Sequence, residues 1–120
     1  MPQQNSLVTV YGIPSCATVK KARKWLDARG APHTFVDFRE TPVGADRIAR
    51  WVDALGAAAL RNTSGQAYRA LPDAKKEWSD AEWAARFTED AMLIRRPVIE
   101  VSGEPVMAGF RTPDALAARL

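Results

Sequence analysis

The feature that most constrains the fold is a strand, a tight turn and a helix in direct succession, with the only cysteine at the turn. The apolar segment Leu7–Tyr11 favours a β-strand, and a helical pattern runs from Val19 to Gly30. Cys16 therefore lies where the first helix begins, beside backbone N–H groups that have no partner within the helix. These groups and the helix dipole favour an anion, so this position favours the thiolate over the thiol.

Two interpretations of this stretch are open. A free cysteine is usually a small buried hydrophobic residue, but such a residue is expected within the strand or on the apolar helix face, and Cys16 is in neither place. Cations follow Cys16 within two turns and either favour its thiolate or form a solvated helix face, which we expect for most of them: Lys20, Lys21, Arg23 and Lys24.

Length and composition indicate one soluble domain over residues 1–120, with 47% hydrophobic and 26% charged residues. A net charge of +3 is too small to indicate a nucleic-acid partner. One cysteine excludes an internal disulfide and a cysteine zinc site, and His33, expected at the surface, cannot form a metal cluster alone. Met1–Ser6 does not have the pattern of a signal peptide, and no segment is long enough to span a membrane. We expect a cytoplasmic monomer with no membrane partner and no bound cofactor.

The rest of the first half repeats the β-α order. Thr34–Phe38 is predicted as a second strand and Ile48–Leu55 as an amphipathic helix, which favours parallel strands with right-handed crossovers. Ala57–Leu60 is predicted as one helical turn and 61–65 as a polar loop. Ser79 and Glu82 have the capping-box spacing and predict a helix over about 80–90.

The last third changes to a period of two. Val98–Val101 and Val106–Phe110 are predicted as the strands of a β-hairpin, with a turn over 102–105. A short helix through Leu120 is predicted to follow, with Thr112 as its N-cap and Pro113 as its first residue.

This order is that of an α/β, thioredoxin-like fold with a helical insertion over about 41–92 and a four-stranded mixed sheet flanked by helices. The chain resembles the arsenate reductase (ArsC)/Spx family over nearly its whole length. The resemblance rests on Tyr11-Gly12-Ile13-Pro14-Ser15-Cys16, Leu60-Arg61-Asn62, Arg95-Arg96-Pro97-Val98 and Gly109-Phe110-Arg111-Thr112-Pro113. The fold implies a cis-proline at Pro97, before the third strand and facing the cysteine.

The resemblance also implies the site residues. Cys16 corresponds to the nucleophile, and three arginines correspond to those around it: Arg61, Arg96 and Arg111. Guanidinium groups bind oxyanions and carboxylates bidentately and stabilise a nearby thiolate. Because Arg96 directly precedes the proline, we expect Arg95 to be the solvated member of the pair.

Two positions depart from the family patterns. The His-Asn pair usual in arsenate reductases is replaced by Gly12 and Ile13, which places the chain near an ArsC-like branch that begins Tyr-Gly-Ile. The Cys-x-x-Cys switch frequent in Spx regulators is absent, since residue 19 is Val19.

We therefore predict an enzyme, a thiol-dependent oxidoreductase related to arsenate reductase. Cys16 would attack arsenate, a related oxyanion or a disulfide, and glutathione or glutaredoxin would supply the second thiol. The alternative is an Spx-like, non-catalytic protein that docks on the transcription machinery. A reactive Cys16 thiolate distinguishes the two, because docking does not need one.

Overall fold

Strand β1 (Val8–Gly12) lies at the centre of the sheet. In this computed structural model, which describes residues 7–120, β1 pairs in parallel with β2 (His33–Asp37) and antiparallel with β3 (Val98–Val101). Strand β4 (Glu104–Ala108) pairs antiparallel with β3, so the strand order is β2-β1-β3-β4. The mixed four-stranded sheet and the antiparallel β1–β3 pair confirm the predicted thioredoxin-like topology.

Helices cover both faces of the sheet. The inward residues of α1 (Ala17–Ala28) and α6 (Asp114–Ala117) pack on one face, against alternate residues of β1 and β3: Val8, Val10, Ile99 and Val101. The other face presents Tyr11 and Val98 to a second core, which the helices between β2 and β3 provide. This alternation follows from the two-residue period of a strand.

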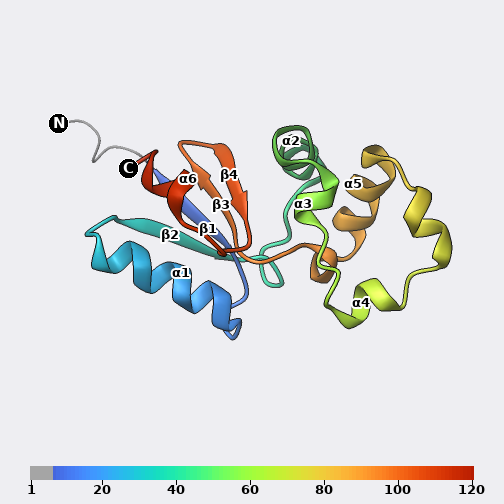
Figure 1. The fold of residues 1–120 in the computed structure, drawn as a ribbon, viewed down its shortest axis with the longest axis horizontal. Coiled ribbons are helices and arrows are strands. Elements are labelled where there is room, and N and C mark those ends of the chain that lie inside the picture. The colour runs from blue at the N-terminus through green and yellow to red at the C-terminus, as the bar shows by residue number, and fades with distance from the viewer. Residues whose placement is uncertain (1–6) are drawn as a thin grey trace.

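The insertion between β2 and β3 is helical, as predicted, and lies beyond one end of the sheet (Figure 1). Trp51 and Trp83 are buried in its core, with Trp78 and Trp83 packed edge to face. The Ser79–Glu82 capping box is present, with both reciprocal hydrogen bonds. The elements of the insertion, in chain order, are α2 (Ala45–Leu55), α3 (Ala57–Leu60), α4 (Gln66–Arg69), η2 (Asp73–Glu77), α5 (Asp80–Glu89) and η3 (Ala91–Leu93).

The predicted boundaries of the last strand and of the last helix are wrong. The hairpin turn is only Ser102-Gly103, both with positive φ, which matches the twist of a two-residue hairpin. The strand β4 therefore begins at Glu104, and it ends before Gly109, whose φ is 81°. Helix α6 is capped by Pro113, whose carbonyl accepts from the N–H of Ala117, so the expected cap Thr112 lies outside the helix.

His33 was expected at the surface, but its side chain is only 5% exposed. Arg23 covers it from α1, because the guanidinium lies 4.6 Å from the centre of the Phe35 ring and Nε donates to His33 Nε2 at 3.3 Å.

One buried carboxylate joins the sheet to the insertion. Glu100 of β3, 2% exposed, is the only charged residue in the buried core of the described chain. It accepts two bonds from Arg47 Nη1, at 2.7 and 2.8 Å, and one from Trp51 Nε1 at 2.7 Å; the Tyr11 hydroxyl donates to it at 3.4 Å. Burial, together with the adjacent carboxylate, raises the pKa of Tyr11, and the hydrogen bond to Glu100 raises the pKa of Arg47.

We predict that Glu100→Gln destabilises the protein by about 2 kcal/mol or more, because an amide cannot accept from Arg47 and Trp51 as a carboxylate does. Urea unfolding would measure the loss. The control is Glu104→Gln, since Glu104 is 71% exposed and pairs only with Arg119, and its loss should stay under about 1 kcal/mol. Equal losses in both variants would contradict the special role of Glu100.

Candidate active site

Cys16 is the residue that caps the N-terminus of α1. Its backbone is extended (φ −74°, ψ 125°), and its carbonyl accepts the first helical hydrogen bond, from the N–H of Lys20 at 3.0 Å. The side chain of Cys16 makes no capping hydrogen bond. The half-buried Cys16 thiol therefore lies beside uncapped backbone N–H groups, in the place that the sequence predicts.

Gly12 allows this turn to lie against α1. A Cβ at residue 12 would be 2.6 Å from Cγ2 of the fully buried Val19, closer than real Cβ atoms approach. The start of α1 is thus packed tightly on the end of β1, which holds Cys16 in position.

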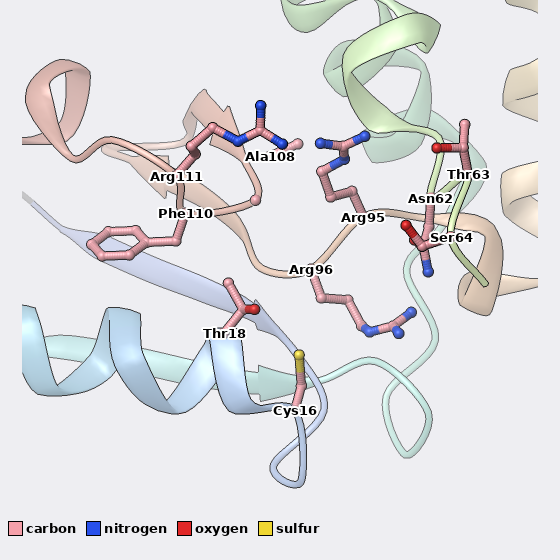
Figure 2. A pocket seen from close by; sticks show the side chains of 11 residues that line it. Cys16, Thr18, Asn62, Thr63, Ser64, Arg95, Arg96, Ala108, Phe110 and Arg111 are labelled. Atoms are coloured by element: carbon pink, nitrogen blue, oxygen red, sulfur yellow. The ribbon is translucent and has the colours of Figure 1, made fainter.

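The Cys16 thiol points into an open cleft of about 460 Å³ between the sheet and the insertion (Figure 2). Four segments that are distant in sequence line this cleft. They contribute Cys16 and Thr18; Asn62, Thr63 and Ser64; Arg95 and Arg96; and Ala108, Gly109, Phe110 and Arg111.

Arg96 lines the cleft from a position two residues before β3. The Arg96–Pro97 peptide bond is cis, the geometry predicted from the sequence. Nη1 of Arg96 donates to the carbonyls of Met92 at 3.4 Å and Ile94 at 3.3 Å, while its buried Nε has no hydrogen-bond partner within the described chain. One side of the guanidinium is therefore held by the backbone, and a buried donor is left for another group.

Arg95 was expected to be solvated, but it is half-buried and lines the cleft. Its Nη2 donates to the carbonyl of Arg61 at 3.4 Å. Its aliphatic stem passes so close to Gly109 that a Cβ there would be 2.9 Å from Cδ of Arg95.

The structure brings Arg111 to the cleft but not Arg61. Arg111 is exposed and follows Phe110, whose ring packs edge to face on Trp25. Arg61 pairs with Ile94 in an isolated antiparallel bridge, and its guanidinium lies 5.6 Å from the centre of the Trp83 ring. Residues opposite one another in such a pair point to the same side, so Arg61 faces the insertion core together with the buried Ile94.

The residues that our sequence analysis missed are Thr18, Arg95 and the polar loop Asn62–Ser64. Asn62 N–H donates to the carbonyl of Leu93 at 2.8 Å, and Arg95 N–H donates to that of Leu60 at 2.6 Å. These two bonds place the loop beside the arginines. The signal for this loop in the sequence was the polar composition of residues 61–65, which overlap the family motif Leu60-Arg61-Asn62.

The charge of the cleft is one-sided. Among the described residues, three arginines line it and no aspartate or glutamate does. Within residues 7–120, none of the three forms a salt bridge. Guanidinium groups gathered without a counter-charge repel one another, so an anion bound among them would relieve that repulsion. The geometry therefore suits an anionic ligand next to a thiol.

The described residues contain no group of three His, Cys, Asp or Glu side chains able to hold a metal ion. In the same part of the chain, no helix combines the length and apolarity needed to cross a bilayer.

Fold and site together define a class. A β2-β1-β3-β4 mixed sheet, a cysteine at the start of α1 and a cis-proline before β3 make this a thioredoxin-like protein with a helical insertion. The chain belongs to the ArsC family, whose sequence profile matches residues 11–118.

Three similar proteins fit this assignment. The protein YusI of Bacillus subtilis, described as uncharacterized, is 32% identical over 87% of this chain and 91% of its own. The structure of a protein named YffB is 33% identical with a TM-score of 0.84, covering 94% of this chain and 98% of its own. The crystal structure of a possible arsenate reductase from Streptococcus mutans is 35% identical with a TM-score of 0.79, covering 90% and 94%.

We predict that Gly12→Ala destabilises the protein by about 1–3 kcal/mol, because the new methyl group overlaps Val19. The control is the same substitution in a Val19→Ala background, which removes the methyl groups that collide. Urea unfolding of the two single variants and the double variant would give the coupling free energy between the two substitutions. Additive effects would show that the collision is not the cause.

Proposed function

We propose that this protein is a thiol-dependent reductase in which Cys16 is the nucleophile and the cleft binds an anionic, oxidised substrate. The observation that carries this proposal is a thiol at a helix N-terminus, pointing into a cleft whose three arginines have no carboxylate partner among residues 7–120. Membership of the ArsC family and similarity to a possible arsenate reductase support a reductase. Arsenate, a related oxyanion and an anionic disulfide are the substrate classes that fit.

The proposed reaction starts from the thiolate form of Cys16, because the thiolate and not the thiol is the nucleophile. With a disulfide, the Cys16 sulfur forms a bond to one substrate sulfur and the other leaves as a thiolate. With an oxyanion, the Cys16 sulfur forms a bond to the central atom and displaces one oxygen, which takes up protons from solvent and leaves as water. Arg96 and Arg111 stabilise the negative charge on the substrate and the leaving group.

The second thiol must come from outside, because the chain contains a single cysteine. We propose glutathione, directly or through glutaredoxin, as this reductant. With a disulfide substrate, the glutathione thiolate attacks the substrate sulfur of the mixed disulfide and releases Cys16, and a second glutathione cleaves the glutathione mixed disulfide so formed. With an oxyanion, the glutathione thiolate forms a bond to the Cys16 sulfur, the central atom keeps the electron pair of the broken bond, and a second glutathione releases Cys16. Two thiols thus become one disulfide for each substrate reduced, and Cys16 returns to the thiolate.

The resemblance also implies Arg61 in anion binding. Its guanidinium packs on Trp83 outside the cleft, so we assign the direct contacts to Arg96 and Arg111 and use Arg61→Ala as a test of this assignment.

We predict that folded Cys16 reacts with iodoacetamide at pH 6 much faster than a cysteine in an unstructured peptide, whose pKa is about 8.5. Glutathione disulfide should give one mixed disulfide, at Cys16, seen by mass spectrometry. The same protein in concentrated urea is the control, because unfolding removes the helix N-terminus and the arginines. If folded and unfolded protein react alike, the nucleophile proposal fails and the Spx-like docking protein becomes the better hypothesis.

We predict that Arg96→Ala weakens binding of arsenate or sulfate about tenfold or more, since a charge-assisted hydrogen bond contributes about 1.5–3 kcal/mol. It should also slow alkylation of Cys16 at pH 6. Arg96→Lys should restore the alkylation rate but only part of the binding, because lysine lacks the bidentate fork.

Calorimetry with Arg61→Ala and Arg119→Ala completes this test. Arg119 pairs with Glu104 at the surface and does not line the cleft, so its loss should not change anion binding. Weaker binding in Arg61→Ala than in Arg96→Ala would overturn our assignment of the arginines. Full affinity in Arg96→Ala would overturn the anion site itself.

A further inference from the structure

We propose that Arg95 and Arg111 form a carboxylate subsite that selects an anionic peptide thiol as the reductant. This inference rests on the proposed function of the cleft and adds a residue to it. Arg95 is the member of the Arg95-Arg96 pair that the sequence analysis expected to be solvated, and the structure gives it a different environment.

The arginine side chains of the cleft point in different directions. Figure 2 shows the guanidinium groups of Arg95 and Arg111 pointing toward one another, away from Cys16. Arg96 extends past Cys16 toward the loop that carries Asn62 and Ser64. Of the three arginines of the cleft, Arg96 therefore lies near the Cys16 thiol, and Arg95 and Arg111 point away from it.

Arg95 is held in place, but its charge is not neutralised. Its stem packs against Gly109, where any side chain would collide with it, and Nη2 donates to the Arg61 carbonyl at 3.4 Å. That long bond is the only one its guanidinium forms within residues 7–120. A guanidinium has five N–H donors, so most of its fork is available to a ligand.

The charges of Arg95 and Arg111 repel one another. Arg95 and Arg111 come from different segments, and neither has a carboxylate partner in the described chain. Packing on Gly109 brings Arg95 to a place where it faces a like charge. A carboxylate between the two would bind both forks bidentately and cancel the repulsion.

The size of the cleft favours an organic ligand. About 460 Å³ lies within the roughly 300–1,000 Å³ of small-molecule sites and exceeds the needs of an inorganic oxyanion. Glutathione has a carboxylate at each end and its thiol between them. With the thiol at Cys16, one carboxylate would reach Arg95 and Arg111, while Asn62, Thr63 and Ser64 offer amide and hydroxyl groups to its peptide bonds.

The test uses ligands that bind without reacting. Calorimetry would compare S-methylglutathione with its dimethyl ester, which lacks the carboxylates, on wild type, Arg95→Ala, Arg95→Lys and Arg119→Ala. Wild type should bind the acid at least about tenfold more tightly than the ester, and Arg95→Ala should remove most of this preference. Arg95→Lys, which keeps the stem against Gly109, should retain part of it, and Arg119→Ala all of it.

Turnover provides the second readout. The ratio of kcat/KM for glutathione to kcat/KM for 2-mercaptoethanol, which is uncharged, should fall about tenfold in Arg95→Ala. If this ratio and the acid-ester preference stay at wild-type values while Cys16→Ser is inactive, the subsite is wrong and the reductase stands. If no thiol supports turnover but the acid-ester preference depends on Arg95, the subsite stands and the reductase is wrong. Equal loss of acid and ester binding in Arg95→Ala would overturn carboxylate selection.

Discussion

The buried Glu100 carboxylate is the interaction on which the position of the cleft depends. It lies on the central pair of strands and is bonded to Arg47 and Trp51 of α2, the first helix of the insertion. An isolated buried carboxylate is costly, so the sheet is most stable when α2 is docked on it. The chain leaves the sheet after β2 and returns through η3 to Arg95, Arg96 and β3. Anchoring α2 therefore also limits where the returning segment, with its two arginines, can lie.

The cleft is formed where these two parts of the molecule meet. The sheet side contributes Cys16 and the segment from Ala108 to Arg111, and the insertion side contributes Asn62–Ser64 and the returning arginines. Neither part contains the whole site. The repulsion among the arginines opposes folding, and the packing that overcomes it is local and apolar: Phe110 on Trp25, the Arg95 stem on Gly109, and Ile94 in the insertion core. Charge is thus concentrated beside the thiol by well-packed neighbours that carry no charge themselves.

The sequence allowed the strand order, the helix that begins at Cys16, the capping box at Ser79 and the cis bond before Pro97 to be predicted, because each depends on local patterns or on a family resemblance. The side of the chain to which each arginine points could not be predicted. For Arg61, this direction depends on its pairing with Ile94 across the insertion. For Arg95 and Arg96, a regular extended segment would point the two adjacent side chains to opposite sides. Arg95 and Arg96 both reach the cleft because the segment is irregular before the cis bond. The hairpin boundary was wrong for a related reason, since Ser102 adopts a positive φ that its residue type does not favour.

At Gly12 the chain departs from the pattern of arsenate reductases, and this departure helps to explain why arginines carry the charge of the cleft. Arsenate reductases of this kind usually have a histidine there, but in this chain a side chain at residue 12 would overlap Val19, which is fully buried against β1. The choice of valine at 19 thus excludes a histidine at 12 as well as a second cysteine at 19. No imidazole from that turn can assist the Cys16 thiolate, and no thiol from α1 can resolve an adduct. Under the proposed function, both tasks would pass to the other side of the cleft: Arg96 would supply the charge, and an external thiol would supply the second sulfur. A site that used an external thiol would benefit from recognising it, and Arg95 is the cation of this cleft that the proposal leaves for that task.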